Sequence, residues 1–431
     1  MKTVAFHTLG CKVNQYDTQA MLELFRAAGY EVVPFEAEAD VYVINTCTVT
    51  GTGDKKSLQL TRRLRRERPE SHIVLAGCLA QRKASELQST GARLIIGTQH
   101  RNQVVSLLER AVAENVCICA VNELNAATPF EEMTITTQDE HTRATLKIQE
   151  GCNNHCTYCI IPSVRGPIRS RSISSIREET QRLVDAGYTE LVLTGIHLSS
   201  YGRDLQDGST LLDAIGAVHE VEGVQRIRLG SLEPTIATEA FAQALAAMPK
   251  VCPQFHLALQ SGSNTVLARM GRRYNMTMYM QAVDNLRAAF PMAAFTTDVL
   301  TCFPGETEAE YQETRQVIRA VGFAKIHVFP YSPREGTKAA VMPDQLSKAV
   351  KERRTRELIA LGEETADAYQ RQWLGKESTV LLEERIDGCW HGYTPEYIPV
   401  TIPDGPACAQ GKLVTVRLTA ASPEGMTGEI I

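Results

Sequence analysis

The chain has 431 residues, of which 43% are hydrophobic, and a formal net charge of −5. This length suggests two or three domains, and no run approaches the roughly 18 apolar residues of a membrane span. The charge excludes a surface coated in positive charge but not a local basic patch. The first residues lack a secretory signal, so we expect a soluble, cytoplasmic protein. Its twelve cysteines should stay reduced, as metal ligands or buried apolar residues.

Residues 1–125 alternate short apolar runs with helical periodicity, which predicts a parallel sheet with helices on its faces. Three of the runs end in cysteine: Val4 to Cys11, Val41 to Cys47 and Ile73 to Cys78. Because the carboxyl ends of parallel strands share one edge of a sheet, we expect these thiols to converge there. The alternative is three unrelated buried cysteines.

The remaining cysteines outside the motif described below give a weaker signal. Cys117 and Cys119 alternate like one face of a strand, and we expect them to pack rather than bind a metal. Four scattered cysteines are predicted to be structural: Cys252, Cys302, Cys389 and Cys408.

A basic segment, predicted to be helical, follows Cys47. It holds seven basic residues against one acid, Glu67: Lys55, Lys56, Arg62, Arg63, Arg65, Arg66 and Arg68. Such a density of charge favours contact with a nucleic-acid backbone. The run from Gly51 to Ser57 is no phosphate-binding loop, since no glycine precedes the lysine at the required spacing.

Residues 126–142 are polar and predicted to form a linker. Shortly after it, Cys152, Cys156 and Cys159 form a C-x3-C-x2-C triplet behind a strand-like run. Three thiolates at these spacings are suited to three corners of an iron–sulfur cluster, leaving one iron open, whereas electron-carrying ferredoxins close all four. The alternative is a zinc site with His155 as an additional ligand.

Residues 143–370 repeat the βα pattern six times, which predicts an incomplete parallel barrel with its function at the carboxyl ends of the strands. The six expected strands are Thr145–Gln149, Glu190–Thr194, Val224–Ser231, Gln254–Gln260, Phe295–Phe303 and Lys325–Tyr331.

A charged helix is expected from Asp344 to Gln372, and residues 371–431 read as a small antiparallel β-barrel. This last part carries five basic and eight acidic residues, so it cannot rely on attraction to phosphate. Contact with RNA there would need aromatic stacking by Trp390, His391, Tyr393 or Tyr397.

The cysteine triplet and its surroundings resemble the radical S-adenosylmethionine (SAM) enzymes, in which the open iron chelates SAM and a 5′-deoxyadenosyl radical is made. Over nearly its whole length the chain is similar to the methylthiotransferase family, which has an N-terminal three-cysteine domain, a radical SAM barrel and a TRAM module. The opening from His7 to Asp17, with Lys12 and Val13 after Cys11, is similar to the bacterial branch that methylthiolates N6-threonylcarbamoyladenosine in tRNA. Other branches act on isopentenyladenosine or on a ribosomal protein.

This resemblance implies two [4Fe-4S] clusters, one on Cys152, Cys156 and Cys159, the other on Cys11, Cys47 and Cys78. It further implies SAM, a tRNA adenosine in the anticodon loop, a reductant protein such as flavodoxin or ferredoxin, and an unidentified sulfur donor. The SAM contacts expected at the strand ends are Tyr158, Gly195, His197, Ser231, Glu233 and Gln260.

Two further features bear on the SAM site. Cys302 stands where the family commonly has glycine, which leaves the local backbone path open. Arg165, Arg169 and Arg171 are candidates to hold a phosphate or the SAM carboxylate, with a solvated charged turn as the alternative.

The leading hypothesis is insertion of a methylthio group at C2 of a modified tRNA adenosine. One rival keeps the chemistry but changes the acceptor to isopentenyladenosine or a ribosomal protein. A rival of another class is a non-catalytic RNA-binding protein in which both cysteine sets hold structural zinc.

Overall fold

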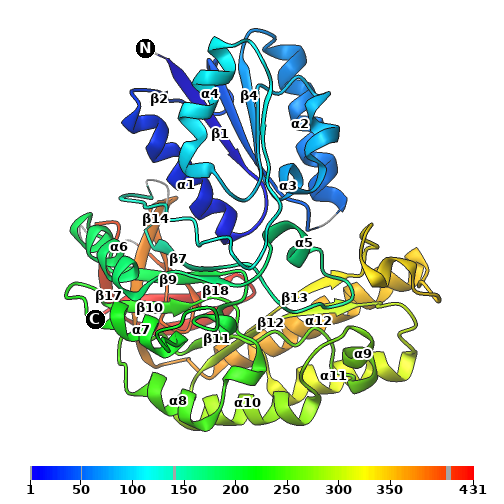
Figure 1. Cartoon of the computed structure of the whole chain (residues 1–431). Helices are drawn as coiled ribbons and strands as arrows, with labels where there is room; N and C mark the ends of the chain where they lie inside the picture. Colours follow the sequence, from blue (N-terminus) through cyan, green and yellow to red (C-terminus); the bar gives the residue numbers. More distant parts are fainter. Residues whose placement is uncertain (1, 50, 139–141, 404–408) are drawn as a thin grey trace.

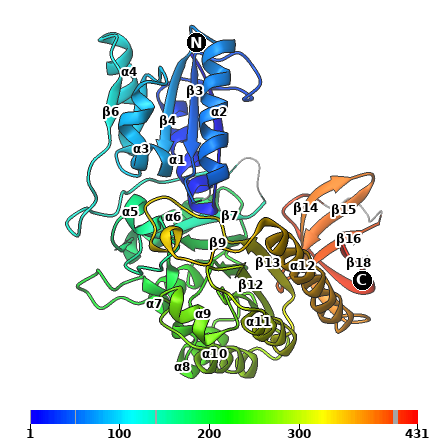
Figure 2. The ribbon, with the colours of Figure 1, turned by 90° about the vertical axis from the view of Figure 1, so that its right-hand side faces the viewer.

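The computed structural model describes residues 2–49, 51–138, 142–403 and 409–431. An N-terminal α/β part lies above a central α/β barrel (Figure 1), and a small β-barrel lies beside the central one (Figure 2). This is the mixed α/β class that the sequence predicts. Within the described ranges, no helix is both long enough and apolar enough to cross a membrane. The divisions near residues 125, 142 and 370 stay predictions.

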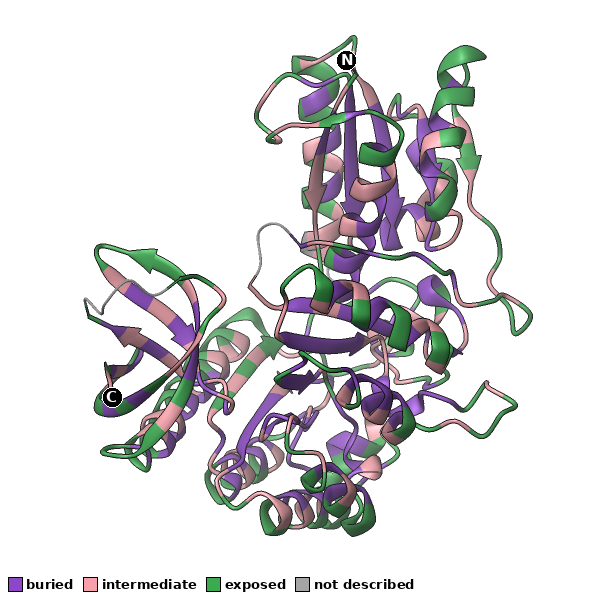
Figure 3. Ribbon diagram, turned by 90° about the vertical axis from the view of Figure 1, so that its left-hand side faces the viewer, coloured by how far each residue is buried: buried purple, intermediate pink, exposed green. Residues whose placement is uncertain are grey.

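The N-terminal part is a six-stranded parallel sheet in the order β2-β1-β3-β4-β5-β6. Its central strand β3 is buried at every residue, as expected for a parallel strand covered on both faces (Figure 3). The strands are β1 (Thr3–Thr8), β2 (Glu31–Val32), β3 (Val41–Thr46), β4 (His72–Gly77), β5 (Leu94–Ile96) and β6 (Ile118–Ala120).

Helices cover both faces of this sheet. Met21 and Phe25 of α1 pack with Leu108 of α4 on one face, and Leu64 of α2 packs with Leu79 of α3 on the other. The helices are α1 (Lys12–Ala27), α2 (Gly51–Glu67), α3 (Cys78–Gln88), η1 (Arg101–Gln103) and α4 (Val104–Ala113). The strands run toward the central barrel, so their carboxyl ends face it (Figure 1).

The prediction that Cys117 and Cys119 pack is wrong, because both are exposed. They flank Ile118 on β6, a three-residue strand at the edge of the sheet. Cys252 and Cys302 are buried and Cys389 is half-buried, while Cys408 lies outside the described residues.

The central part consists of two sheets, β10-β9-β7-β8 and β11-β12-β13. Parallel bridges from Ile227 to Val251 and from Leu232 to Leu257 join the sheets into one open barrel. All six predicted strands are present, and a short antiparallel strand, β8, was not predicted. The strands are β7 (Ala144–Glu150), β8 (Arg169–Ser170), β9 (Glu190–Gly195), β10 (Arg226–Leu229), β11 (Gln254–His256), β12 (Ala294–Thr301) and β13 (Lys325–Pro330).

The outer face of the barrel is apolar and covered by helices. Phe255 and Phe295, for example, are buried in the same core as Leu286 of α10. The helices are α5 (Ile161–Arg165), α6 (Ile173–Asp185), η2 (Leu198–Ser200), α7 (Leu211–His219), η3 (Pro234–Ile236), α8 (Glu239–Ala246), α9 (Asn264–Arg269), α10 (Met276–Ala289), α11 (Glu308–Val321), η4 (Lys338–Val341) and α12 (Lys348–Arg371). The long helix α12 confirms the predicted charged helix.

The inner face of the barrel is polar. Because alternate residues of a strand point to opposite faces, Glu190 of β9 and its register partner Arg226 of β10 share this inner face. Arg228, two residues along β10, bonds Glu190 at 2.9 Å. A buried salt-bridged interior of this kind leaves room for polar ligands rather than for a packed apolar core.

The C-terminal part is a closed barrel in the order β14-β15-β16-β18-β17. Its strands are antiparallel except for one parallel pairing, β16 with β18, which the sequence did not predict. The strands are β14 (Glu377–Ile386), β15 (Cys389–Tyr393), β16 (Pro399–Ile402), β17 (Leu413–Ser422) and β18 (Gly425–Ile430).

The polar connection between the first two parts contains no helix or strand in its described residues, 126–138 and 142. It is nevertheless packed against the protein. Met133 and Ile135 are buried in the central core, and Glu131 is buried in an ion pair with Arg101.

Candidate active site

The loop after β7 carries the cysteine triplet. Gly151 opens this loop with φ of +72°, and a Cβ there would lie 1.9 Å from the carbonyl oxygen of Pro167, so only glycine fits. The backbone N–H of Asn154 donates to Cys152 Sγ at 3.4 Å. Arg272, which follows α9, donates from Nη1 to Cys156 Sγ at 3.3 Å. The loop thus presents free thiols that backbone and guanidinium donors already orient.

The other three cysteines follow neighbouring strands. Cys11 lies just before α1, Cys47 follows β3 and Cys78 is the first residue of α3. A Cβ on Gly10, which has φ of +111°, would lie 3.1 Å from Cys47 Sγ, so the Cys11 turn packs directly on Cys47. The charge of a Cys11 thiolate also acts on the pKa of both Cys47 and Cys78. The predicted convergence of these thiols at one sheet edge is therefore present.

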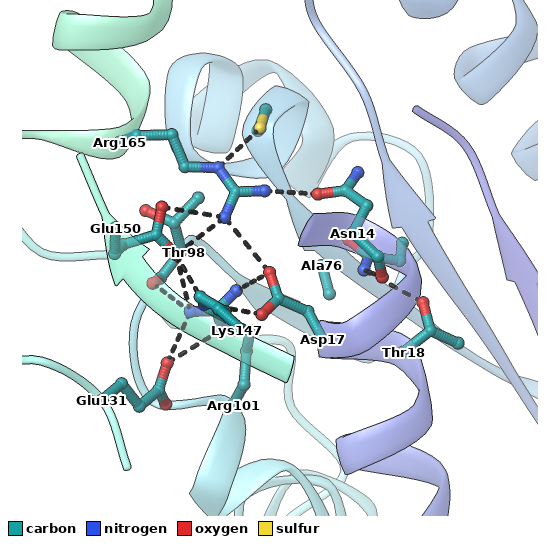
Figure 4. Close-up of polar contacts among 12 residues, drawn as sticks. Asn14, Asp17, Thr18, Ala76, Thr98, Arg101, Glu131, Lys147, Glu150 and Arg165 are labelled. Carbon is teal, nitrogen blue, oxygen red and sulfur yellow. Dashed lines mark hydrogen bonds and ion pairs between the residues drawn. The ribbon is translucent and has the colours of Figure 1, made fainter. Parts of the chain in front are cut away.

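Asn14 and Arg165 connect the N-terminal thiol set to the central part of the chain. Asn14 Nδ2 donates to the carbonyl oxygens of Leu9 at 2.6 Å and Thr46 at 3.1 Å, which fixes the turns before Cys11 and Cys47. Arg165, six residues after Cys159, donates from Nε to Cys78 Sγ at 3.1 Å and from Nη2 to Asn14 Oδ1 (Figure 4). One side chain from the central part therefore contacts the thiol site of the N-terminal part.

Arg165 belongs to a buried charge network between the two parts (Figure 4). Its Nη1 lies 3.0 Å from Glu150 Oε2, and Lys147 Nζ lies 2.6 Å from the same carboxylate and 2.8 Å from Asp17. Arg101 pairs with Asp17 and lies 2.8 Å from Glu131. Three cations and three carboxylates balance, as burial of charge requires.

This network corrects the prediction for the arginines after the cysteine loop. Arg165 and Arg171 are fully buried, and Arg169 is buried, so a solvated charged turn does not describe them. Arg171 pairs with Glu179 at 2.6 Å, and Arg169 Nη2 donates to the Arg165 carbonyl at 2.9 Å. The charges of Arg165 and Arg171 are thus committed to the protein, whereas Arg169 Nε and Nη1 have no hydrogen-bond partner within the described residues.

Burial governs the acidity of the thiols. It raises the pKa of Cys78 to about 11, although the Arg165 charge opposes the shift, and raises the pKa of Cys159 to about 12. It also raises the pKa of Cys47 and Cys152. These thiols are consequently protonated at neutral pH, and a bound metal would have to displace their protons.

Some of the residues predicted to contact SAM do come together. His197 Nε2 lies 3.2 Å from Glu233 Oε2, and Asn154 Nδ2 lies 3.2 Å from His197 Nε2. Arg272 Nη2 pairs with Glu233 at 3.1 Å, so this polar group directly adjoins Cys156. Gly195 packs on Gln149, where a Cβ would lie 2.8 Å from the Gln149 Cβ.

The remaining predicted SAM residues stand further along the barrel mouth. Ser231 is exposed, and the half-buried Tyr158 packs edge-on against Phe303. Gln260 has φ of +60° and its backbone N–H donates to the Asp298 carbonyl at 2.9 Å. None of these contacts tests the assignment to SAM, which stays a prediction.

Cys302 resolves the question of the local backbone. It has φ of +60°, the left-handed region that favours glycine, and its backbone N–H donates to Glu306 Oε2 at 2.7 Å. The chain therefore keeps the conformation of a glycine here at the cost of some backbone strain. Its side chain is buried.

Three contributors were missed from the sequence: Asn14, Asn154 and Arg272. Asn14 and Asn154 lie within three residues of a candidate ligand cysteine, and a side-chain amide so close to a cysteine is the signal that would have found them. Arg272 has no such signal, because it reaches Cys156 only through the fold.

The basic helix is exposed as expected. The side chains of Lys55, Lys56, Arg62, Arg63, Arg65 and Arg66 are all solvent-facing on α2, which begins four residues after Cys47. Exposure at this density is compatible with a phosphate contact.

The aromatic residues of the C-terminal barrel differ from expectation. Trp390 is buried in the barrel core and is not free to stack on a base. Tyr393 and Tyr397 stack on each other at 4.5 Å between ring centroids, and the Arg143 guanidinium lies 4.9 Å from the Tyr397 ring. These two tyrosines hold the small barrel against the central one; His391 is half-buried, with Nδ1 3.3 Å from Thr401 Oγ1.

The donor sets suit iron–sulfur clusters. Both consist of free cysteines, and in each a guanidinium donates to one sulfur, a type of hydrogen bond that stabilises and tunes such clusters. In the part of the chain that the structure describes, no three His, Cys, Asp or Glu side chains are gathered around a single metal-ion position.

Comparisons with known proteins match this geometry. Residues 3–97 match a family described as uncharacterized protein family UPF0004, and residues 146–318 match the radical SAM superfamily. Among solved structures, the chain is similar to the radical S-adenosylmethionine methyltransferase TsrM from Kitasatospora setae, with a TM-score of 0.57 at 14% identity, covering 79% of this chain and 77% of that one. The similarity to this solved structure concerns the fold alone.

Curated relatives match over nearly the whole chain. A protein of Bacillus subtilis (strain 168), named threonylcarbamoyladenosine tRNA methylthiotransferase MtaB, is 44% identical over 98% of this chain and 94% of its own. A tRNA-2-methylthio-N(6)-dimethylallyladenosine synthase of Moorella thermoacetica is 35% identical over 100% of this chain and 98% of its own. The chain is therefore an enzyme of the radical SAM superfamily and belongs to the tRNA methylthiotransferases of the MtaB type.

Proposed function

We propose that this enzyme inserts a methylthio group at C2 of N6-threonylcarbamoyladenosine in the anticodon loop of tRNA. The observation that carries the proposal is that Arg165, from the segment that follows the cysteine triplet, donates to Cys78 of the other thiol set and pairs with Glu150 at the end of β7. The substrate follows the Bacillus subtilis relative, which at 44% identity is more similar than the 35% identical relative named for dimethylallyladenosine. Membership of the enzyme family removes the non-catalytic alternative.

The two thiol sets would have different roles. Radical SAM enzymes use SAM and a [4Fe-4S] cluster, and when bound these groups supply the one-electron chemistry that side chains cannot. Cys152, Cys156 and Cys159 would hold that cluster. Cys11, Cys47 and Cys78 would hold a second one, the site of the sulfur to be transferred. Fixing both on one interface keeps the two halves of the reaction at a constant separation.

The chain's own residues would bind and orient SAM and exclude water. Glu233 and Asn154 are suited to the ammonium and ribose hydroxyls of SAM, since both already lie beside the cysteine loop. His197 is held in position by its Glu233 and Ser200 contacts. Gly195, Ser231, Gln260 and the backbone beside Tyr158 complete the proposed mouth of the site.

The expected partners follow from the proposed reaction. The exposed basic face of α2 would contact the tRNA backbone. A small reductant protein, such as flavodoxin or ferredoxin, would supply electrons; the sulfur donor is not identified by any feature of the chain.

Mass spectrometry of tRNA nucleosides tests the proposal most directly. Cells lacking the protein should lose 2-methylthio-N6-threonylcarbamoyladenosine and accumulate its unmodified precursor. Restoring the wild-type gene should restore the product, whereas a variant lacking Cys152, Cys156 and Cys159 should not. If the cells instead lose 2-methylthio-N6-dimethylallyladenosine, the substrate is dimethylallyladenosine and the proposal is wrong.

A further inference from the structure

A cavity of about 350 Å³ lies where the three parts of the molecule meet. Lys12 of α1 lines it from the N-terminal part, Arg143 and Val192 from the central part, and Glu383 and Tyr397 from the C-terminal barrel. Val192 pairs in register with Arg228, whose side chain bonds across the inner face of the central barrel. The central part therefore lines the cavity from the amino end of β7 and from Val192 of β9.

Most of the cations around this cavity already have partners. Arg143 Nε lies 2.6 Å from Glu383 Oε1, and its guanidinium faces the rings of Tyr393 and Tyr397. Arg228 bonds Glu190 at 2.9 Å and covers the other side of the Tyr397 ring at 4.6 Å. Neither guanidinium is free to bind a ligand without breaking these contacts.

Lys12 is different, because its ammonium has no hydrogen bond or ion pair within the described parts of the chain. Its side chain is exposed to solvent and lines the cavity. A cation in this position gains from any anion that enters the cavity.

Lys12 also stands directly after Cys11, so the cavity adjoins the turn that carries the first thiol of the N-terminal set. Gln15, which lines the same cavity one helical turn later, offers an amide on the same face of α1. Glu384 is the remaining charged group of the lining and is exposed on β14, where solvent screens its charge.

We propose that this cavity receives the N6 substituent of the substrate base and that Lys12 binds the carboxylate of its threonyl group. The inference rests on the proposed function, since only a threonylcarbamoyl group brings a carboxylate to the base, whereas a dimethylallyl group is wholly apolar. Lys12 is then a specificity-determining residue. Gln15 is placed to accept a hydrogen bond from the threonyl hydroxyl or to donate one to it. The ligand class is a carboxylate-bearing purine nucleotide.

The test uses two synthetic anticodon stem-loop RNAs, one with N6-threonylcarbamoyladenosine and one with its uncharged carboxamide. Dissociation constants are measured for the reconstituted wild-type enzyme and for Lys12→Met. The wild-type should prefer the acid by about tenfold to one-hundredfold, the effect of one charge-assisted hydrogen bond. Lys12→Met should bind both RNAs alike, and Lys12→Arg should keep most of the preference.

Lys348→Met serves as the matched control, because it removes an exposed lysine of α12 and should leave the preference for the acid unchanged. If Lys12→Met weakens the binding of both RNAs equally, Lys12 contacts a phosphate and the inference is overturned. An unchanged preference in Lys12→Met overturns it as well. Reduced SAM affinity in this variant, with the RNA preference intact, would assign Lys12 to the SAM carboxylate instead.

Failure of the proposed function gives a separate signal. A wild-type enzyme that cleaves SAM and prefers the acid RNA, but forms no methylthio product from it, would contradict the proposed reaction while leaving the Lys12 contact standing. Product formation by the wild-type together with an unchanged preference in Lys12→Met would contradict only the inference.

Discussion

The two thiol sets are built in opposite ways. Cys152, Cys156 and Cys159 lie within eight residues on one loop, whereas Cys11, Cys47 and Cys78 come from three neighbouring strand ends. The first set needs one glycine turn and one arginine, and the second needs the whole N-terminal sheet in register. A local motif and a tertiary assembly thus supply the same three donors.

The cation beside each set differs as well. Arg272 is close to the surface, with 9% of its side chain exposed, and divides its donors between Cys156 and Glu233. Arg165 is fully buried and belongs to the charge network that closes the interface. The sulfur environment of the loop is therefore local, while that of the sheet edge depends on contact between two parts of the chain.

The strongest way to separate the sets is to remove the loop. Replacing Cys152, Cys156 and Cys159 by Ala should lower the iron content from about eight atoms to about four per chain and abolish SAM cleavage. Iron analysis and quantification of 5′-deoxyadenosine measure both effects. SAM cleavage that survives this change would refute the radical SAM assignment of the loop.

The complementary change tests the sheet edge. Replacing Cys11, Cys47 and Cys78 by Ala should leave SAM cleavage largely intact, because the loop and its polar neighbours lie in the central part. Methylthio transfer to tRNA should vanish, as mass spectrometry of the nucleosides would detect. Methylthio product from this variant would show that the second thiol set is not the sulfur site.

A smaller effect is expected when the basic face of α2, the proposed tRNA-binding surface, is changed. Changing Arg62, Arg63, Arg65 and Arg66 of α2 to Glu should weaken tRNA binding and flatten its salt dependence by a log–log slope of about 0.7 to 0.9 per lost phosphate contact. SAM cleavage without RNA should stay nearly unchanged. Titrations at several salt concentrations give the slope.

A control replaces two exposed basic residues of a distant helix, Lys348 and Arg356 of α12, by Glu. This change should affect tRNA binding much less than the α2 variant. Equal weakening by both variants would indicate a diffuse electrostatic effect and would move the footprint away from the N-terminal thiol set.

The finest comparison uses the two arginines. Hydrogen bonds to cluster sulfurs shift reduction potentials, and a cationic donor favours the reduced state. Arg165→Gln should lower the potential of the sheet-edge cluster only, and Arg272→Gln that of the loop cluster only. Redox titration followed by electron paramagnetic resonance, on variants that keep one thiol set each, resolves the two potentials. A shift in the wrong cluster would contradict the assignment of donors.

The sequence predicted those features that depend on local patterns. The triplet spacing, the strands ending in Cys11, Cys47 and Cys78, and the six strands of the barrel all follow from periodicity along short segments. The destinations of long side chains did not follow. Arg165 reaches residues of α1 and α3, and Arg272 reaches Cys156 from more than a hundred residues away, so their roles exist only in the folded chain.

The same limit explains the wrong predictions. Tyr393 and Tyr397 resemble exposed stacking residues in the sequence, but arginines of the central part cover them. Cys117 and Cys119 alternate like a packed strand, yet β6 is too short and too near the edge of its sheet to bury them. The alternation of residue types along a strand predicts which side chains share a face, but it does not predict which other parts of the protein cover that face.

The buried charge network also sets an order for biosynthesis. While residues beyond about 125 are still being translated, Asp17 and Arg101 are already made and able to pair with each other. Their remaining partners, Glu131, Lys147, Glu150 and Arg165, arrive later, the last three on the segment that also carries Cys152, Cys156 and Cys159. The loop thiols therefore leave the ribosome at the same stage at which the network becomes neutral. At that stage Arg165 also becomes able to donate to Cys78.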